Sequence, residues 1–363
     1  MHMPPPVHGA AMMGKYIHDS KVINEKFDCH YFNLTLARNL EDIGKGGLRK
    51  LHDFISQLKN IRKEVKAFKP DLCYVTPNSK GGAFYKDFCV VMMLKLMRQN
   101  IVVHYHNKGV STHQDKPLDN FLYKLFFKNL KVILLANGLY NDVKRYVTKE
   151  NVFICPNGIP EATQAKDTSK RNDSIPHILF LSNLLIDKGV FTLLDACKLL
   201  KEKGIIFICD FIGGESKDIN ADSFQAEVKK RELEQNVFYH GKRFGTEKEE
   251  FFRKTDLFVL PTYDECFPLV LLEAMQHHIA CIASNEGGIS DIIDEGKTGF
   301  IVEKRNARQL ADRIRYLIEH PESCKEMGEN GYKKYRSQFT LRTFENRMKE
   351  ILAECCKLPD LKF

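Results

Sequence analysis

Two glutamates with seven residues between them, Glu265 and Glu273, are the clearest candidates for chemistry in this sequence of 363 residues. They lie in the stretch PTYDECFPLVLLEAMQHHIACIASNEGG, residues 261–288. A carboxylate accepts hydrogen bonds from hydroxyl groups, which suits a sugar or a ribose. The stretch ends at Gly287-Gly288, where backbone N–H groups at the start of a helix favour an anion such as phosphate. These neighbouring features predict a pocket for a nucleotide sugar.

The sequence around the two glutamates predicts the elements that position them. The run from Asp256 to Leu260 is apolar and bounded by a proline, which is typical of a buried parallel strand. A helix from Pro268 to His277 follows, and Ile279 to Ala283 forms a second buried strand. Because ligands of open α/β sheets bind at the carboxyl ends of the strands, both glutamates are predicted to lie at a binding edge.

The sequence ECFPLVLLEAM, followed by GGISDII, resembles the retaining glycosyltransferases of the GT-B fold, glycosyltransferase family 4. The resemblance implies an α/β protein with two facing Rossmann-like, doubly wound domains and a cleft between them. It also implies transfer of a sugar from a UDP-sugar or GDP-sugar to an acceptor hydroxyl, with retention of configuration. No cofactor and no metal ion are expected, and no Asp-x-Asp motif stands in a loop after a predicted strand.

By the same resemblance, Glu273 binds the ribose hydroxyls and Glu265 reaches the donor sugar. Phe267 and Pro268 shape the surroundings of that sugar. His106, at the end of a predicted strand, orients a sugar hydroxyl or helps to receive the acceptor proton. His104 lies two residues earlier and is predicted to share its face of the strand.

The remaining donor-binding candidates concern the diphosphate and the base. Lys188 precedes a helix and can meet a diphosphate beside the helix N-terminus. Asn183 stands where the family usually has an arginine, and it brings no charge. Gly9 is expected in a glycine loop near the phosphates, and Arg243 in a loop that touches the base.

Strands and helices alternate in two series, which predicts two domains. We expect an acceptor domain over residues 1–165, a donor domain over 175–338, and a C-terminal helix over 339–363 that packs back on the first domain. The polar stretch from Glu161 to Ser174 is the predicted linker. Only Met1 to Met3 precede the loop with Gly9, so the first strand is missing or very short, and Phe27 to Leu34 is predicted to be a strand.

One helix has two open interpretations. Five apolar side chains of the predicted helix from Pro117 to Leu130 share a face, which is either a core face or a membrane-contacting face. They are Leu118, Phe121, Leu122, Leu125 and Phe126.

The charge is unevenly distributed. The net charge is +8, and residues 1–165 carry 24 Lys and Arg against 14 Asp and Glu, a net +10 that leaves −2 for the rest. A basic first half suits an anionic membrane surface or an acidic acceptor, or it is ordinary solubilising lysine. No nucleic-acid-binding motif is present, so nucleic acid is not an expected partner.

The cysteines and the hydropathy pattern indicate the cellular compartment in which the protein works. The 11 cysteines include no C-x-x-C pair and no zinc spacing, which favours reduced thiols in a cytosol. No apolar run of transmembrane length and no secretion signal are found. We therefore expect a cytoplasmic protein, peripheral on the inner face of the membrane if its acceptor is a lipid-linked glycan, as in envelope polysaccharide synthesis.

Three alternatives remain. The chain is a non-catalytic nucleotide-sugar-binding or assembly protein on the same fold. It is an NAD-dependent oxidoreductase, although the G-x-G-x-x-G motif after a strand is missing. Or it is a phosphorylase on the same architecture, which requires a lysine that binds pyridoxal phosphate.

Overall fold

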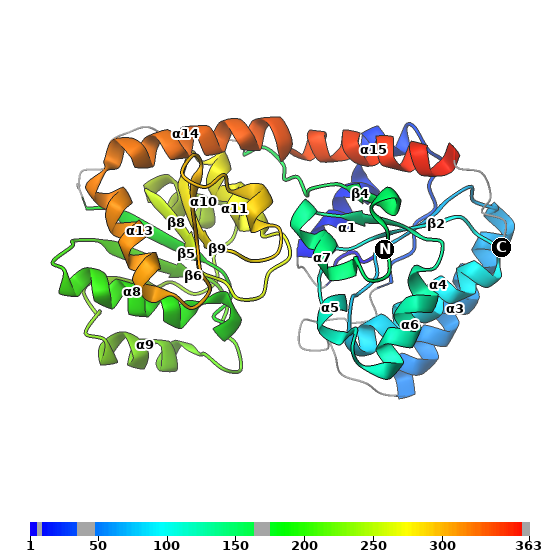
Figure 1. The fold of residues 1–363 in the computed structure, drawn as a ribbon, viewed down its shortest axis with the longest axis horizontal. Helices are drawn as coiled ribbons and strands as arrows, with labels where there is room; N and C mark the ends of the chain where they lie inside the picture. The colour runs from blue at the N-terminus through cyan, green and yellow to red at the C-terminus, as the bar shows by residue number, and fades with distance from the viewer. Residues whose placement is uncertain (6–8, 35–47, 163–174, 358–363) are drawn as a thin grey trace. The chain divides into compact units, whose positions relative to one another are not determined.

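The computed structural model describes residues 1–5, 9–34, 48–162 and 175–357. The chain divides into two compact units. Unit 1 comprises Met1–Gly158 and Leu341–Phe363, and unit 2 comprises Ile159–Thr340. Each unit contains a parallel sheet with helices packed around it (Figure 1). The predicted α/β class with two parallel-sheet domains is confirmed.

Unit 1 is built on a sheet of four parallel strands in the order β1-β2-β3-β4. The strands are β1 (Cys73–Val75), β2 (Ile101–His104), β3 (Lys131–Leu134) and β4 (Val152–Ile154). The central strand β2 is buried at every position, as its continuous apolar sequence predicts. In the described part of unit 1, the sheet is wound in one direction only.

The described α-helices of unit 1 precede, separate and follow these strands. They are α1 (Gly9–Asp19), α2 (Lys21–Asn24), α3 (Leu48–Phe68), α4 (Gly81–Leu96), α5 (Val110–His113), α6 (Pro117–Phe127), α7 (Tyr140–Val143) and α15 (Leu341–Lys357). The sequence of residues 48–68 predicts a long amphipathic helix that ends before Lys69-Pro70, and the bounds of α3 confirm this prediction. The last helix, α15, contacts α2, and Asn100 donates a hydrogen bond to the Cys355 carbonyl at 2.9 Å.

The strand predicted from Phe27 to Leu34 is wrong, because this segment forms no ladder with another strand. Its backbone bonds are to the first residues of the chain instead. The Leu34 N–H donates to the Met1 carbonyl at 2.9 Å, and the Asn33 side chain bonds both the N–H and the C=O of Met3.

The predicted core face of α6 is also wrong. The structure buries Asp119, Tyr123, Phe126 and Phe127, and it leaves Leu118 and Phe121 exposed to 60% and 58%. Polar contacts explain the rotation of the helix. Asp119 accepts a hydrogen bond from the Tyr85 hydroxyl at 2.7 Å, and the Tyr123 hydroxyl donates to the Ser79 carbonyl at 2.6 Å.

Unit 2 has a six-stranded parallel sheet in the order β10-β9-β8-β5-β6-β7. The strands are β5 (His177–Leu181), β6 (Ile208–Ile212), β7 (Val237–Tyr239), β8 (Leu257–Leu260), β9 (Ala280–Ser284) and β10 (Gly299–Val302). The chain winds from β5 outward to β7 and then returns to β8 on the other side of β5. The sheet therefore has a topological switch point between β5 and β8, where ligands bind in doubly wound folds.

The helices of unit 2 cover this sheet. They are α8 (Val190–Glu202), α9 (Ala221–Lys230), α10 (Gly245–Lys254), α11 (Leu269–Gln276), α12 (Ile289–Ile292), α13 (Ala307–Glu319) and α14 (Pro321–Gln338). Contacts of α13 with α8 and of α11 with α14 close the helical layers. The short 3₁₀ turn η4 (Ile186–Lys188) precedes α8.

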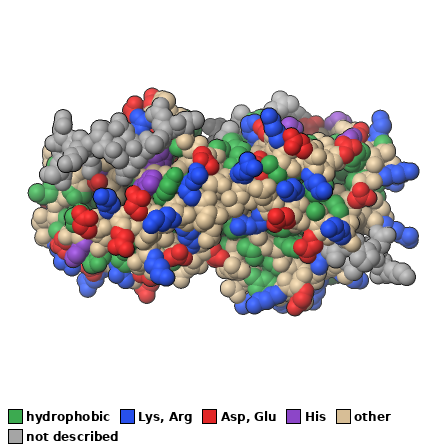
Figure 2. Space-filling model, turned by 90° about the horizontal axis from the view of Figure 1, so that it is seen from above, with side chains coloured by type: hydrophobic (Ala, Val, Ile, Leu, Met, Phe, Trp, Pro, Cys, Tyr) green, Lys and Arg blue, Asp and Glu red, His purple; other side chains and the backbone are tan. Residues whose placement is uncertain are grey.

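Four further observations concern the chain as described. Residues 163–174 of the predicted linker lie outside the described residues. Over the described ranges, no helix combines the length and apolar character needed to cross a bilayer. Within those same ranges, no three His, Cys, Asp or Glu side chains gather as metal ligands would. On the face displayed in Figure 2, charged side chains of both signs are interspersed.

Candidate functional site

The switch point of the unit 2 sheet brings together two of the predicted site residues. Lys188 follows β5 and Glu265 follows β8, and Lys188 Nζ lies 2.5 Å from Glu265 Oε2. Lys188 also donates to the Asp264 carbonyl at 3.2 Å. Both side chains are about four-fifths buried, with 21% and 20% of their surfaces exposed. An acid and a base are thus paired at the carboxyl edge where this fold binds ligands.

The loop that carries Lys188 is fixed to the loop after β8. Gly189 has a φ of 78°, and a Cβ at that position would lie 2.0 Å from the Pro261 carbonyl oxygen. Only glycine therefore permits this approach. The Asp187 carbonyl accepts hydrogen bonds from the Tyr263 N–H at 2.6 Å and from the Thr262 hydroxyl at 3.1 Å.

The Gly287-Gly288 turn supports the Glu265 loop. Gly287 has a φ of 55°, and a Cβ there would lie 2.3 Å from the Glu265 carbonyl oxygen. The Gly288 N–H donates to the Cys266 carbonyl at 2.7 Å. The expectation of a bare N–H at Gly288 is therefore wrong, since this group already holds the loop, and the helix that follows, α12, is a single turn.

Glu273 lies on α11, as predicted, with one carboxylate oxygen paired and the other not. Its Oε1 accepts a hydrogen bond from Lys248 at 3.0 Å. Its Oε2 is buried and has no hydrogen-bond partner among the described residues. Burial raises the pKa of Glu273, and the Lys248 ammonium opposes that shift. A buried acceptor without a partner is rare in proteins and marks a place for a donor.

Asn183 connects two loops at the same edge of the sheet. Its Oδ1 accepts a hydrogen bond from the Gly214 N–H at 2.9 Å. Lys242 lies over the same glycine: a Cβ at Gly214 would be 2.3 Å from Lys242 Cε and 3.0 Å from Asn183 Oδ1. An exposed lysine therefore stands beside the position where an arginine was expected.

Three further predicted residues surround this edge with different roles. Arg243 lies 3.6 Å from Glu247 on α10 and donates to the Lys242 carbonyl. Phe267 is 4% exposed, and its ring packs against Phe339 at 6.0 Å between centroids. Pro268 is the N-cap residue of α11. Phe267 is therefore a core residue of unit 2.

The predicted residues of unit 1 lie at the carboxyl end of its own sheet and at α1. The rings of His104 and His106 are 4.1 Å apart, so the predicted shared face is confirmed. His104 is fully buried, and its Nδ1 lies 2.8 Å from the Tyr74 hydroxyl. Burial holds the pKa of His104 well below its ordinary value, with a smaller effect from His106. Gly9 is the first residue of α1.

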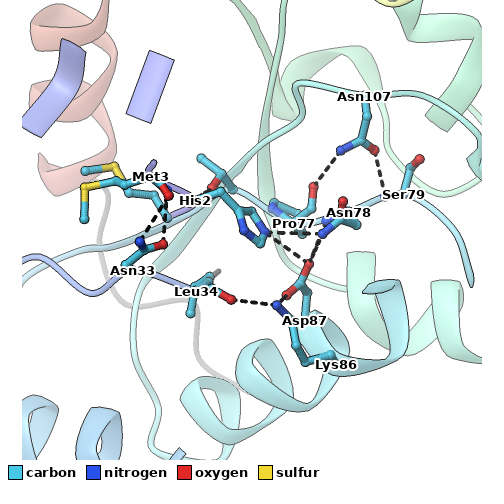
Figure 3. Close-up of polar contacts among 12 residues, drawn as sticks. His2, Met3, Asn33, Leu34, Pro77, Asn78, Ser79, Lys86, Asp87 and Asn107 are labelled. Atoms are coloured by element: carbon cyan, nitrogen blue, oxygen red, sulfur yellow. Dashed lines mark hydrogen bonds and ion pairs between the residues drawn. The ribbon is translucent and has the colours of Figure 1, made fainter. Parts of the chain in front are cut away.

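A buried carboxylate in unit 1 was not predicted from the sequence. Asp87 on α4 is fully buried, and its Oδ2 accepts hydrogen bonds from the Asn78 backbone and side chain, each at 2.8 Å (Figure 3). His2 lies 3.6 Å from Asp87 Oδ2, and Lys86 3.4 Å from Oδ1. Burial alone would raise the pKa of Asp87, but the contacts with His2, Lys86 and Asn78 outweigh it and lower the pKa.

This network fixes the loop after β1. Asn107, from the loop after β2, accepts a hydrogen bond from the Ser79 N–H at 2.8 Å and donates to the Pro77 carbonyl (Figure 3). A single acid within the apolar run of α4 is the signal that identifies Asp87 in the sequence. Lys248 and Lys242 carry no such signal, because they are ordinary lysines until the fold places them.

Comparisons with known proteins give this site its chemical class. Residues 161–334 match the family model of the glycosyl transferases group 1. They span most of unit 2 and contain Lys188, Glu265 and Glu273. Over 337 residues the chain is 28% identical to the capsular polysaccharide biosynthesis glycosyltransferase CapM of Staphylococcus aureus, covering 81% of this chain and 88% of CapM. The chain is a glycosyltransferase.

Solved structures place this glycosyltransferase in the GT-B fold. It superposes on sucrose-phosphate synthase from Thermosynechococcus elongatus with a TM-score of 0.72 and 17% identity, over 95% of this chain and 92% of that one. The match to Anabaena HepE in complex with UDP has a TM-score of 0.68 and 18% identity, over 82% of each chain. The predicted fold and the predicted enzyme class are confirmed.

Proposed function

We propose that this glycosyltransferase transfers a sugar from a UDP-sugar or GDP-sugar to an acceptor hydroxyl with retention, as a member of glycosyltransferase family 4. Unit 2 is the donor domain in this proposal, and unit 1 is the acceptor domain. The observation that carries the proposal is the buried Oε2 of Glu273, which has no hydrogen-bond partner among the described residues. Glu273 lies on the helix after the switch-point strand β8.

Glu273 binds the ribose in this proposal. Lys248 already donates to Oε1, so the charge of the carboxylate is partly matched and its orientation is fixed. Oε2 is left to accept a hydrogen bond from a ribose hydroxyl. That bond is charge-assisted, since the acceptor is ionised.

Lys188 and Lys242 bind the diphosphate. Lys188 stands at the switch point, and Lys242 lies beside Asn183, where it supplies the positive charge that asparagine lacks. Both ammonium groups stabilise the charge that develops on the departing diphosphate as the glycosidic bond breaks. Gly287 keeps the backbone of its loop close to the phosphates, and the loop at Arg243 touches the base.

In this proposal, Glu265 contacts the donor sugar after its ion pair with Lys188 is broken. A diphosphate competes with Glu265 for Lys188, because the two carry the same sign of charge. When Lys188 turns to phosphate, Glu265 Oε2 becomes available to a sugar hydroxyl, while its Oε1 still accepts the Cys266 N–H at 3.2 Å. Diphosphate binding and sugar recognition are thereby coupled through one contact.

His106 acts on the acceptor side. We assign it the orientation of a sugar hydroxyl or the reception of the acceptor proton. Neutral His104, bonded to Tyr74, packs against His106 and fixes its ring. The acceptor hydroxyl attacks from the face of the leaving group. Its proton goes to the departing phosphate if His106 only orients the hydroxyl, and to His106 if the imidazole is the base.

The names of the similar proteins support the choice of substrates. CapM is a capsular polysaccharide biosynthesis enzyme, and HepE was solved with UDP. We propose a lipid-linked or glycan acceptor in the synthesis of an envelope polysaccharide or glycolipid. The enzyme then works in the cytoplasm, at the inner face of the membrane.

Turnover of defined donors tests the proposal. Purified enzyme is incubated with UDP-glucose, UDP-galactose, UDP-N-acetylglucosamine and GDP-mannose, with and without membrane glycolipid extract. We expect release of one nucleoside diphosphate, increased by the extract, and an anomeric configuration in the product equal to that of the donor. Tight nucleotide binding without any release would favour the non-catalytic binding protein instead.

A further inference from the structure

Two neighbouring helices of unit 1, α4 and α6, leave apolar side chains outside the core. On α6, Leu118, Phe121 and Leu125 are exposed to 60%, 58% and 36%. On α4, Leu96 is exposed to 82%, and Tyr85 and Cys89 are also exposed. Contiguous exposed apolar side chains are uncommon on a protein that has no partner for them.

The apolar residues form a stripe along each helix. At 100° per residue, Leu118, Phe121 and Leu125 lie within about 60° of one another around α6. Tyr85, Cys89 and Leu96 lie within about 40° around α4. Because the buried residues of α4, such as Phe84 and Val91, lie on the other side, its outer face is apolar although the helix already has a core face.

Side-chain contacts join the two stripes into one surface. Tyr85, near the start of α4, donates to Asp119 near the start of α6 at 2.7 Å. Lys95, near the end of α4, donates to the carbonyls of Leu125 and Lys128 at 2.8 Å and 2.7 Å. The helices therefore run side by side in the same direction (Figure 1).

Basic side chains border the stripes, and no exposed acid does within residues 80–98 and 116–128. The acids of these segments, Asp87 and Asp119, are both buried. Asp115, just before α6, is paired with Arg145 at 2.7 Å. The exposed cations of the two segments are Lys80, Arg98, Lys116, Lys124 and Lys128.

We propose that this α4/α6 face docks on an anionic lipid bilayer, with its apolar side chains among the acyl chains and its lysines at the headgroups. The charge complementarity selects this occupant, because apolar residues bordered by exposed cations are the pattern of interfacial helices. A second copy of the chain would bring the same cations against one another. The inference rests on the proposed function, in which the acceptor is lipid-linked, and it names the surface that reaches that acceptor.

The sequence contains no tryptophan, so one introduced indole reports on this surface alone. In Phe121→Trp, we expect the emission to shift to shorter wavelength when vesicles with one third phosphatidylglycerol are added. The matched control is Ile206→Trp, at a position in unit 2 that is 69% exposed, and its emission stays unchanged. An unchanged spectrum for Phe121→Trp would overturn the proposal.

Charge reversal separates lipid attraction from other causes. The triple variant K116E/K124E/K128E is expected to bind these vesicles at least tenfold more weakly at low salt, since each cation contributes to the attraction. The control K229E/K325E/K333E reverses three exposed lysines of unit 2 and retains binding. Equal losses in both variants would overturn the assignment of this face.

The remaining outcomes are distinguished without donor turnover. Sedimentation velocity of wild type and of L118S/F121S, without lipid, tests for a second copy; a dimer lost in the variant with vesicle binding intact would overturn the proposal. Stabilisation by a nucleoside diphosphate is measured on the same proteins. Vesicle binding without stabilisation by a nucleotide would overturn the donor site and leave the docking surface. Stabilisation by a nucleotide without vesicle binding would overturn the docking surface and leave the donor site.

Discussion

At the scale of single residues, Glu273 carries the donor site because one of its oxygens is bonded and the other is not. Lys248 holds Oε1, and Oε2 is a buried acceptor without a partner among the described residues. The ionised carboxylate is costly to bury, which is why its pKa is raised. A ribose hydroxyl would relieve that cost, so ligand binding and ionisation are linked.

The linkage predicts a pH dependence. As the pH falls through the raised pKa of Glu273, the carboxyl gains a proton and loses its strength as an acceptor. We expect the affinity for the nucleoside diphosphate to fall in the wild type as the pH is lowered from neutral through that raised pKa. In Glu273→Gln, affinity at pH 7 is expected to be about tenfold lower, with a flatter profile. Calorimetric titrations at several pH values measure both.

The nucleotide's own phosphate titrates in both proteins, so the difference between them isolates Glu273. Parallel profiles in the wild type and in Glu273→Gln would show that the carboxyl does not titrate with binding. Without nucleotide, the raised pKa of Glu273 has the opposite effect on the free energy of unfolding, which falls as the pH rises. The ionised group lowers stability as the pH rises through that pKa, and Glu273→Gln removes this loss.

Lys242 gives a second prediction at this scale. If it supplies the charge missing at Asn183, Lys242→Ala weakens binding of the nucleoside diphosphate by about five- to tenfold, the value of one charged contact. Binding of the nucleoside without phosphates remains unchanged. The control Lys229→Ala removes an exposed lysine of α9 and alters neither affinity. Equal weakening for nucleoside and diphosphate would argue against a phosphate contact.

At the scale of elements, the carboxyl-edge loops of unit 2 are held together by close approaches of glycine to backbone carbonyls. Gly189 packs on Pro261, Gly213 on Ser182, and Gly287 on the carbonyls of Glu265 and Cys266. These contacts fix Lys188 and Glu265 on opposite sides of the switch point. The loops are therefore part of the rigid sheet edge, and a side chain at these glycines would displace a site residue.

Substitution of Gly287 tests this arrangement. In Gly287→Ala, the new Cβ would lie 2.3 Å from the Glu265 carbonyl oxygen at a φ of 55°, so the backbone must move. We expect a loss of about 2–4 kcal/mol in the free energy of unfolding, together with weaker nucleotide binding. The measurement is urea unfolding followed by circular dichroism.

A second glycine is the matched control. Gly296 has a φ of 70°, and nothing lies within 4 Å of the position a Cβ would take. In Gly296→Ala, we therefore expect the free energy of unfolding to fall by only about 1 kcal/mol, the cost of a left-handed backbone for alanine. Nucleotide binding is expected to stay intact. Similar losses in the two variants would mean that the close approach at Gly287 contributes nothing.

At the scale of the whole molecule, periodic sequence predicted most elements, and long-range contacts account for the failures. The bounds of β5 and β10 follow from continuous apolar runs between turn residues. Phe27 to Leu34 has the composition of a strand, but its Leu34 N–H bonds the Met1 carbonyl, and the segment pairs with no strand of the described residues. The orientation of α6 was not predictable, because the helix is apolar on nearly every side and distant Tyr85 and Ser79 set its rotation.

The candidate site shows the same difference between features that local sequence predicts and features that long-range contacts set. Glu265 and Glu273 were predicted because a motif carries them, and Lys188 because it precedes a helix. The switch point explains why the strands before Lys188 and Glu265 meet. Lys248 and Lys242 join the candidate site only through contacts between residues far apart in the sequence. The expected bare N–H at Gly288 failed for a similar reason, since it bonds to Cys266, 22 residues earlier.

The most direct test of the central claim is thermal unfolding of the wild type and of Glu273→Ala with UDP, GDP, ADP and NAD. At about 100 times its dissociation constant, a bound ligand stabilises the folded state by about 2.7 kcal/mol. We predict that UDP or GDP alone raises the melting temperature of the wild type, and that the rise is lost in Glu273→Ala. A rise with neither nucleotide, or one of equal size in the variant, would contradict a nucleotide-sugar site at Glu273.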